Sequence, residues 1–344
     1  MVLGAIVVVG AECGAHRPEI RSVIHRPDST EPLLPPSLQC AEMLGRSLVE
    51  HIVERFLAAT VEVVTVLVHS SLSAQLPAFR GAFESVTVLA SGDLEASINE
   101  ALKQHADEGV DYTFVTDAST YTECDFIDLL WFHRGSQRTV TRTFDRGGPL
   151  NLWLATGSKL EDGGREFLAP AVEAGSEGYF ISDYVSRLAH PHDMRRLAEN
   201  ALRGRCEIRP QGQEVRPGVW VDEGAHLHKR ARIVAPAYIG VGSVIREDTV
   251  VTRCSNIESH CYIDYGTVIE DSSILTNSYV GIWLDVTHAV VEGRRLWNLP
   301  RNVGLEIADA SVIRQNVASP REGGGNLHRI GDPTARWLTA AHSD

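Results

Sequence analysis

Aliphatic residues recur at every sixth position in the C-terminal third of the 344-residue chain. Ten consecutive hexads carry one: Val221, Leu227, Ile233, Ile239, Ile245, Val251, Ile257, Ile263, Ile269 and Leu275. Two positions before each stands a small or β-branched residue, in the order Val219, Ala225, Ala231, Ala237, Ser243, Thr249, Ser255, Cys261, Thr267 and Ser273. Such a period is typical of a solenoid in which each hexad forms one short strand and one turn. We therefore predict a β-solenoid over residues 217–316, with three hexads to a coil and the aliphatic residues inside.

The hexad register ends after Leu275, because residues 279–283 read Tyr-Val-Gly-Ile-Trp. A segment rich in aromatic and turn residues follows, and residues 310–312 can resume a coil. We predict a loop extruded from the solenoid between Trp283 and Trp297, which either covers a ligand or neighbouring subunit or caps the core. Residues 317–344 contain three consecutive glycines. We predict that they form a poorly packed tail.

The N-terminal part alternates between strand and helix patterns. Strands are predicted at residues 2–9, 63–68, 85–90, 112–115, 138–144 and 150–155, and helices at 39–58, 73–80, 94–102 and 122–133. This rhythm indicates an α/β domain over residues 1–189, with a mainly parallel sheet covered on both faces. The pattern of residues 190–203 predicts a helix. This helix opens a segment, residues 190–216, that connects the α/β domain to the solenoid.

The charge balance argues against nucleic-acid and membrane partners. Lys and Arg number 32 against 45 Asp and Glu, a net charge of −13, and such a surface repels phosphate backbones and anionic lipids. The apolar run at the N-terminus, residues 2–9, is far shorter than the roughly 20 residues of a membrane span. Six scattered cysteines contain no CxxC pair, which favours neither a zinc ribbon nor a disulfide framework. We expect a cytoplasmic protein with reduced thiols.

Three local matches accompany this domain order. Residues 10–17 (Gly-Ala-Glu-Cys-Gly-Ala-His-Arg) follow the first strand, residues 30–35 (Thr-Glu-Pro-Leu-Leu-Pro) precede a predicted helix, and Asp117 closes the strand pattern Phe-Val-Thr-Asp. Over residues 1–290 the chain thereby resembles the sugar-1-phosphate nucleotidyltransferases. That family carries Gly-Gly-x-Gly-Thr-Arg after its first strand, then Pro-Lys-Pro-x-Leu-Pro, and later a metal-binding Asp.

The resemblance implies a nucleotidyltransferase-like (Rossmann-like) mixed-sheet domain followed by a left-handed parallel β-helix, through which the chain forms homo-oligomers. It also implies a reaction with Mg²⁺ as the cofactor. In this reaction a nucleoside triphosphate and a sugar 1-phosphate form a nucleotide-sugar and release pyrophosphate. The roles carried over are catalytic for Arg17 and Asp117, nucleotide-binding for Gly10, Ala11, Gly14 and Gly92, sugar-side for Gly178 and Asp183, and metal-binding for Asp117 and Asp222.

Two departures bear on activity. Glu31 stands where the family has a phosphate-binding Lys, and Glu12 adds a second carboxylate to the glycine-rich loop. Both would repel a triphosphate. An alternative is therefore a member that has lost its chemistry and serves as a ligand-sensing or assembly subunit. Another is a hexapeptide acyltransferase that uses a coil histidine as general base, with candidates His226, His228, His260 and His288.

Several of these residues also have a structural interpretation. Gly10 and Gly14 can form a tight turn, and Asp117 can cap a helix or hold a turn. Asp183 can be a helix N-cap, Asp222 lies beside a hexad position, and Arg17 and Arg21 can be solvated loop charges. The sequence leaves these alternatives open.

Overall fold

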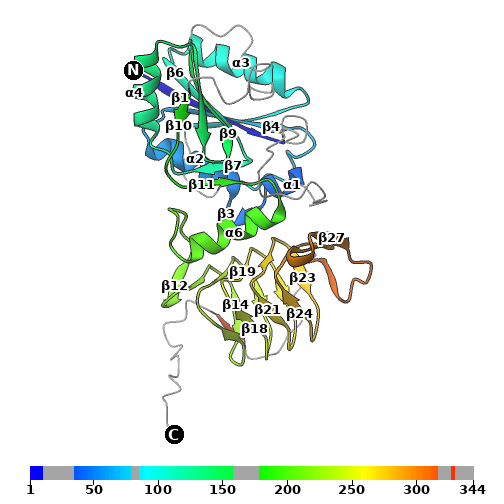
Figure 1. Cartoon of the computed structure of the whole chain (residues 1–344). Coiled ribbons are helices and arrows are strands. Elements are labelled where there is room, and N and C mark those ends of the chain that lie inside the picture. Colours follow the sequence, from blue (N-terminus) through cyan, green and yellow to red (C-terminus); the bar gives the residue numbers. More distant parts are fainter. Residues whose placement is uncertain (11–34, 80–84, 158–177, 317–326, 330–344) are drawn as a thin grey trace. The chain divides into compact units, whose positions relative to one another are not determined.

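The computed structural model describes residues 1–10, 35–79, 85–157, 178–316 and 327–329 (Figure 1). The chain divides into two compact units. The first, here called the α/β unit, comprises residues 1–41, 46–197 and 206–208, and the second, the coil unit, comprises 42–45, 198–205 and 209–344. The described cysteines, at positions 40, 124, 206, 254 and 261, are buried and form no disulfide, and Cys13 lies outside the described residues.

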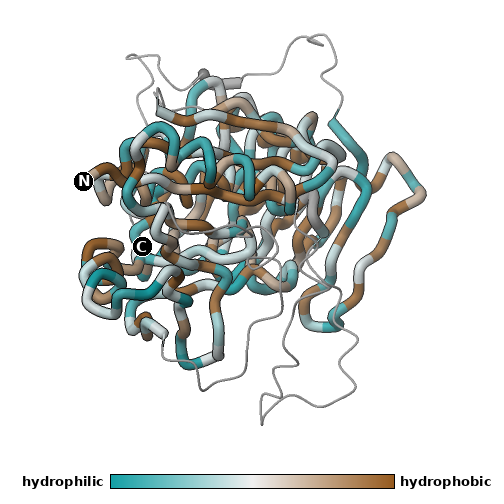
Figure 2. Tube along the Cα trace, turned by 90° about the horizontal axis from the view of Figure 1, so that it is seen from above, coloured by the Kyte–Doolittle hydropathy of each residue, from teal (hydrophilic) through white to brown (hydrophobic). Residues whose placement is uncertain are grey.

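A seven-stranded mixed sheet forms the centre of the α/β unit. Its order is β10 (Tyr179–Phe180), β8 (Val140–Asp145), β9 (Gly148–Thr156), β6 (Tyr112–Asp117), β1 (Leu3–Val9), β4 (Val63–His69) and β5 (Val86–Ser91). β1 pairs in parallel with β4 and β6, whereas β9 runs antiparallel to β6 and β8. β1 is buried along its whole length and is brown where it begins near the N-terminus in Figure 2. The predicted Rossmann-like α/β sheet is confirmed.

Helices cover both faces of this sheet, as predicted. α3 (Leu94–Asp107) packs its apolar stripe against one face, where Ile98 joins Ile6 and Val115 in one cluster. On the other face the Phe114 ring lies 5.7 Å from Phe56 of α2 (Leu48–Ala58) and 5.2 Å from Phe126 of α4 (Phe126–Ser136). Neighbouring residues of a strand point to opposite faces. Val115 of β6 therefore packs against α3, and Phe114 packs against α2 and α4. The predicted connecting helix is α6 (Pro191–Leu202).

The prediction of one helix over residues 39–58 is wrong in its first half. α1 (Pro36–Gln39) is a single turn, and a hairpin of β2 (Glu42–Met43) and β3 (Arg46–Ser47) precedes α2. α2 begins where Ser47 and Glu50 form a capping box, with the Ser47 N–H donating to Glu50 Oε2 at 2.8 Å. Apolar residues keep a helical spacing through the hairpin. For this reason the spacing alone did not show that α2 begins only at Leu48.

Two other helix predictions are also wrong in part. Residues 70–75 form turns, and no helix follows in the described residues up to 79, where Pro77 lacks the N–H that a helix interior needs. The helix predicted at 122–133 starts at Phe126, after the strand β7 (Thr120–Thr122). Asp125 caps it by accepting the Asp128 N–H at 3.0 Å.

Two histidines are buried in the α/β unit as neutral hydrogen-bonding groups. His105 Nε2 lies 2.9 Å from Thr65 Oγ1 and its Nδ1 lies 3.3 Å from Thr113 Oγ1. His133 Nδ1 and Nε2 lie 2.7 Å from Thr141 Oγ1 and 2.9 Å from Thr156 Oγ1. Burial lowers the pKa of both imidazoles. These histidines therefore contribute to the core.

A pH titration tests this role. His105 has a lower pKa in the folded than in the unfolded state, so below about pH 6.5 the unfolded state binds the proton more strongly and the free energy of unfolding falls. Wild-type protein should therefore lose more stability between pH 7.5 and 5.5 than His105→Gln, measured by urea unfolding. Equal losses in the two proteins would contradict a neutral, buried imidazole.

The coil unit contains three sheets that the chain visits in rotation. The first is β12 (Gln213–Arg216), β13 (Val219–Val221), β16 (Ala237–Ile239), β19 (Asn256–Ile257), β22 (Ser273–Ile274), β25 (Ala289–Glu292), β26 (Arg295–Asn298) and β27 (Val303–Glu306). The second is β28 (Ile313–Gln315), β23 (Ser278–Val280), β20 (Tyr262–Ile263), β17 (Val244–Ile245), β14 (His226–His228) and β29 (Leu327–Arg329). The third is β15 (Arg232–Ile233), β18 (Val250–Thr252), β21 (Val268–Glu270) and β24 (Asp285–Thr287). Within each sheet, strands from successive coils pair in parallel.

Nine of the ten predicted inward positions, from Val221 to Ile269, contribute to the core of this unit. The tenth prediction, Leu275, is wrong. Ile257 pairs with Ile274, not with Leu275, so this coil is one residue shorter than those before it. Asp271, with φ +44°, lies in the shortened corner. The coils then continue, with Val280, Val286 and Val291 inside, through the segment where the hexad register was predicted to end.

The small residues of each hexad bridge successive coils when they carry a hydroxyl group. Ser243 Oγ donates to the Glu258 carbonyl at 2.6 Å and accepts the Cys261 N–H at 2.9 Å. Ser255 likewise accepts the Ser272 N–H at 3.1 Å. A buried hydroxyl thus pairs polar backbone groups that a methyl group would leave unsatisfied.

The extruded segment is a β-hairpin that begins later than predicted. β26 and β27 extend the first sheet in antiparallel fashion, with Val290 opposite the buried Trp297. Trp283 still belongs to a coil corner, where its exposed ring packs edge-on against Tyr265 at 5.1 Å. β28, after residues 310–312, returns antiparallel to β23 and does not resume a parallel coil.

Candidate functional site

The strand order of the α/β sheet reverses beside β1. The chain continues from β1 to β4 and β5 on one side and then crosses to β6 on the other. Open α/β sheets bind ligands at the carboxyl ends of strands at such a switch point. Val8 pairs with Asp117, and the Ala118 N–H donates to the Val8 carbonyl at 2.9 Å. Gly10 and Asp117, two residues singled out from the sequence, therefore lie at the same sheet edge.

Asp117 is buried, and neutral donors surround its carboxylate. Oδ1 accepts the Ser119 N–H at 3.0 Å and the Ser119 hydroxyl at 2.5 Å, while Oδ2 accepts Asn151 Nδ2 at 2.6 Å. Burial raises the pKa of Asp117, and the hydrogen bonds from Ser119 and Asn151 act in the opposite direction. A carboxylate has roughly four acceptor positions, so the contacts among the described residues leave one, on Oδ2, for a ligand.

Gly10 forms a tight turn directly after β1. Its φ of +87° is a left-handed conformation, and a Cβ there would lie 2.8 Å from Leu72 Cδ1 and 2.9 Å from His69 Cβ. Its N–H donates to Gln39 Oε1 of α1 at 2.8 Å. Both conformation and packing require glycine here, so the structural interpretation of Gly10 holds whether or not a phosphate binds beside it.

Several polar residues at this edge were not predicted from the sequence. His69 ends β4, and its Nδ1 lies 2.7 Å from Ser71 Oγ. A search for polar residues immediately after each strand would have found this pair and Ser119. Asn151 lies inside β9, where nothing in the local pattern marks it, because the antiparallel pairing of β9 with β6 brings it to Asp117.

Part of the predicted site lies outside the described residues: Ala11, Glu12, Gly14, Arg17, Arg21 and Glu31. Gly92 is described and follows β5 at the same edge as Gly10 and Asp117. A Cβ on Gly92 would have only Ser70 Oγ nearby, at 3.8 Å. Packing therefore does not demand glycine at position 92, in contrast to position 10.

Gly178 and Asp183 flank β10, at the far end of the sheet. A Cβ on Gly178 would overlap the Phe144 ring and lie 2.7 Å from the Arg142 carbonyl of β8. Asp183 is exposed in the bend between β10 and β11 (Val185–Arg187). The alternative of Asp183 as a helix N-cap is wrong, because α6 begins only at Pro191, where the Asp193 carboxylate accepts the His190 N–H at 3.0 Å.

Substitution of Gly178 separates a packing role from a sugar-side role. Gly178→Ala should lower the free energy of unfolding by about 2 kcal/mol, because the methyl group forces β10 away from β8. Gly92→Ala is the matched control and should change it by less than about 0.5 kcal/mol. Denaturant unfolding measures both, and an unchanged stability of Gly178→Ala would show that β10 yields freely.

The two predicted metal ligands, Asp117 and Asp222, belong to different units. Asp222 belongs to the coil unit, where its Oδ1 accepts the Glu223 N–H at 2.7 Å and its Oδ2 the Tyr238 hydroxyl at 3.2 Å. Among the described residues, no three His, Cys, Asp or Glu side chains group so as to hold a metal. Mg²⁺ often relies on one or two carboxylates, waters and substrate phosphates, so Asp117 fits as a single ligand.

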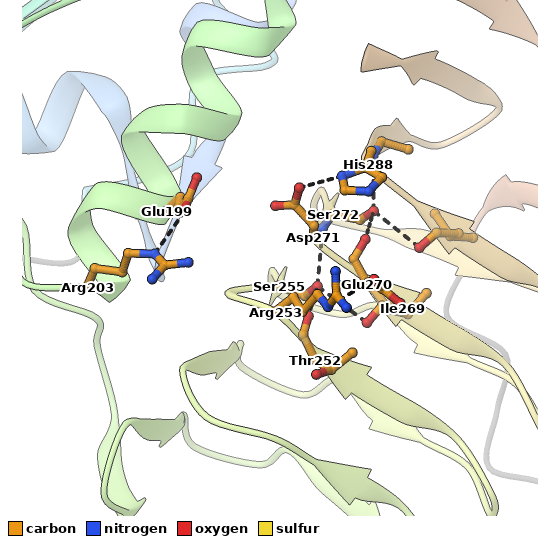
Figure 3. Close-up of polar contacts among 12 residues, drawn as sticks. Glu199, Arg203, Thr252, Arg253, Ser255, Ile269, Glu270, Asp271, Ser272 and His288 are labelled. Atoms are coloured by element: carbon orange, nitrogen blue, oxygen red, sulfur yellow. Dashed lines mark hydrogen bonds and ion pairs between the residues drawn. The ribbon is translucent and has the colours of Figure 1, made fainter. Parts of the chain in front are cut away.

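The coil histidines differ in their surroundings. His228 Nε2 lies 3.4 Å from Glu247, and His260 is an exposed corner residue with φ +57°. His288 Nδ1 lies 2.5 Å from Asp271 Oδ2, and Figure 3 shows the imidazole turned toward that carboxylate. A carboxylate on Nδ1 orients an imidazole, as general bases require. The acyltransferase alternative stays a prediction.

No described helix is both long and apolar enough to cross a membrane. Neither the protein-family models nor the curated proteins with which the sequence was compared match it.

Proposed function

We propose that this protein is a cytoplasmic sugar-1-phosphate nucleotidyltransferase-like protein that binds a nucleotide and a sugar 1-phosphate at the carboxyl edge of β1 and β6. The observation that carries the proposal is the reversal of strand order beside β1, which brings Gly10 and Asp117 to one edge. The proposal includes the left-handed course of the coils and the formation of homo-oligomers through the coil unit.

In the proposed reaction the phosphate of the sugar attacks the α-phosphate of the nucleotide, and pyrophosphate leaves. Positioning and charge neutralisation supply the catalysis in such a transfer. Asp117 would hold Mg²⁺, which supplies positive charge to the phosphates when bound. Ser119 and Asn151 would fix the carboxylate, and Arg17 would add a cation.

A second candidate is a member that binds these ligands without turnover. The specific observation in its favour is that neutral donors already occupy three acceptor positions of Asp117. A carboxylate so engaged holds the turn after β6 without any metal. Glu12 and Glu31 favour the same candidate through their charge.

Turnover and binding assays on the full chain separate the two candidates. The protein is incubated with each nucleoside triphosphate, a panel of sugar 1-phosphates and Mg²⁺, and pyrophosphate is measured. Release that requires one nucleotide and one sugar phosphate supports the enzyme. Thermal stabilisation by these ligands without pyrophosphate release supports the binding protein. Neither release nor stabilisation with any pair would overturn both.

A further inference from the structure

Helix α4 exposes large apolar side chains on its outer side. Ile127, Trp131 and Phe132, here called the α4 face, are 39%, 60% and 39% exposed. By contrast, α2 and α3 expose no large apolar side chain among their described residues. The residues of α4 that pack inward are buried: Phe126, Leu129, Leu130 and His133. A contiguous apolar group on the surface of one helix is typical of an interaction surface.

The apolar surface continues from α4 onto β10, the edge strand of the sheet. The Phe132 ring packs edge-on against Tyr179 of β10 at 5.5 Å. Phe180, the next residue of this strand, is 54% exposed. The exposed apolar area therefore extends beyond one helix, as a contact between proteins requires.

Charged residues of opposite sign flank Trp131 at equal distances along α4. Trp131 is the middle residue of the helix, Asp128 precedes it by three residues, and Arg134 follows it by three. Residues three apart lie on the same side of a helix, and all three of these residues are exposed. Asp125, the exposed N-cap, adds negative charge at the first end. The outer side of α4 is thus acidic in its first half, apolar at its centre and basic in its second half.

Contacts within the chain hold these side chains in place. Arg134 Cζ lies 5.1 Å from the centre of the Trp131 ring, a cation–π contact that orients the indole on the surface. Asp128 Oδ2 accepts the Tyr179 hydroxyl at 2.6 Å. Gly135, beside Arg134, has no side chain, and a Cβ there would have nothing within 4 Å. The α4 face is therefore ordered before a partner binds, and space remains at its basic end.

We propose that α4 joins two copies of this chain, with the two helices antiparallel about a twofold axis beside Trp131. In a twofold contact the same surface meets itself, so Trp131 faces its own equivalent at the centre. The acidic half of each helix then meets the basic half of the other, which is a favourable arrangement of charges and of helix dipoles. A second copy supplies this reversed charge pattern by symmetry. The contact belongs to the α/β unit and depends neither on the proposed function nor on the proposed contact through the coil unit.

The molar mass of the full chain, measured by light scattering, tests the proposal. Trp131→Glu places a charge at the centre of the contact, so its mass should be at least about twofold below that of wild type at equal concentration. Val88→Glu is the matched control and should keep the wild-type mass, because Val88 is 48% exposed on β5, at the opposite edge of the same sheet. Circular dichroism establishes that both variants are folded. Equal masses of wild type and Trp131→Glu would overturn the proposal.

Two charge reversals distinguish a second copy from any other partner. Asp128→Lys and Arg134→Glu each bring like charges together when the variant pairs with itself, so each should dimerise at least about tenfold more weakly than wild type. In an equimolar mixture the new lysine of one chain meets the new glutamate of the other, and the unchanged Arg134 and Asp128 also meet. The mixture should therefore associate about as strongly as wild type. A mixture that associates no more strongly than the separate variants would show that α4 does not pair with itself.

Discussion

Replacement of Asp117 by asparagine should reduce pyrophosphate release by about 100-fold or more if the nucleotidyltransferase proposal is correct, because it removes the carboxylate assigned to Mg²⁺. The substitution keeps the size of the side chain. It also puts an amide group where Oδ1 and Oδ2 accept hydrogen bonds from Ser119 and Asn151. Some loss of stability is therefore expected in either case, and activity must be measured at a temperature where the variant remains folded.

Asp111→Asn is the matched control. Asp111 lies just before β6, at the opposite end of the strand from Asp117, and its exposed carboxylate accepts the Val2 N–H at 2.8 Å. Activity should be unchanged in this variant. If Asp117→Asn loses stability but retains wild-type turnover, Asp117 only holds the turn after β6, and the metal assignment is wrong.

Replacement of Ile257 by alanine should lower the free energy of unfolding of the coil unit by about 3 kcal/mol. Ile257 is fully buried and lies between Ile239 and Ile274 of the neighbouring coils, to which it is paired in register. Removing its outer carbons leaves a cavity that the flat stack of strands cannot easily close. Hydrogen exchange of the coil strands measures this effect separately from the α/β unit.

Val234→Ala is the control for this substitution. Val234 is an aliphatic residue of the same unit, but it lies at a corner and is 42% exposed. Its loss should change the stability by less than about 0.5 kcal/mol. A small effect of Ile257→Ala, comparable with that of Val234→Ala, would mean that the stacked aliphatic positions do not form the stabilising core.

How far the fold could be predicted depended on how local the determining interactions are. The strands β1, β4 and β6 were recognisable because each is a run of apolar residues. The start of α2 was not, because the apolar spacing continues through the preceding hairpin, whose turn is held by Glu258 from a distant part of the chain. For the same reason the shortened coil was missed, because the shift from Leu275 to Ile274 is visible only in the strand pairing.

The candidate site shows the same limit. Gly10 and Asp117 stood out because each ends a recognisable strand, and the switch point brings them together. Asn151 did not, because its proximity to Asp117 results from the antiparallel insertion of β9 beside β6. The predicted loop residues, among them Arg17 and Glu31, lie outside the described part of the chain, so their roles remain predictions.

The sequence by itself determined the alternation of strands and helices in the first part and the sixfold repeat in the second, because buried periodic positions leave a pattern along the chain. Tertiary structure alone decided which distant groups meet. It placed the Asn151 side chain on Asp117 and two backbone N–H groups on Glu258. The physical reason is that a buried polar group must find its partner wherever the fold supplies one. Such pairings depend on proximity in space, which the order of residues does not display.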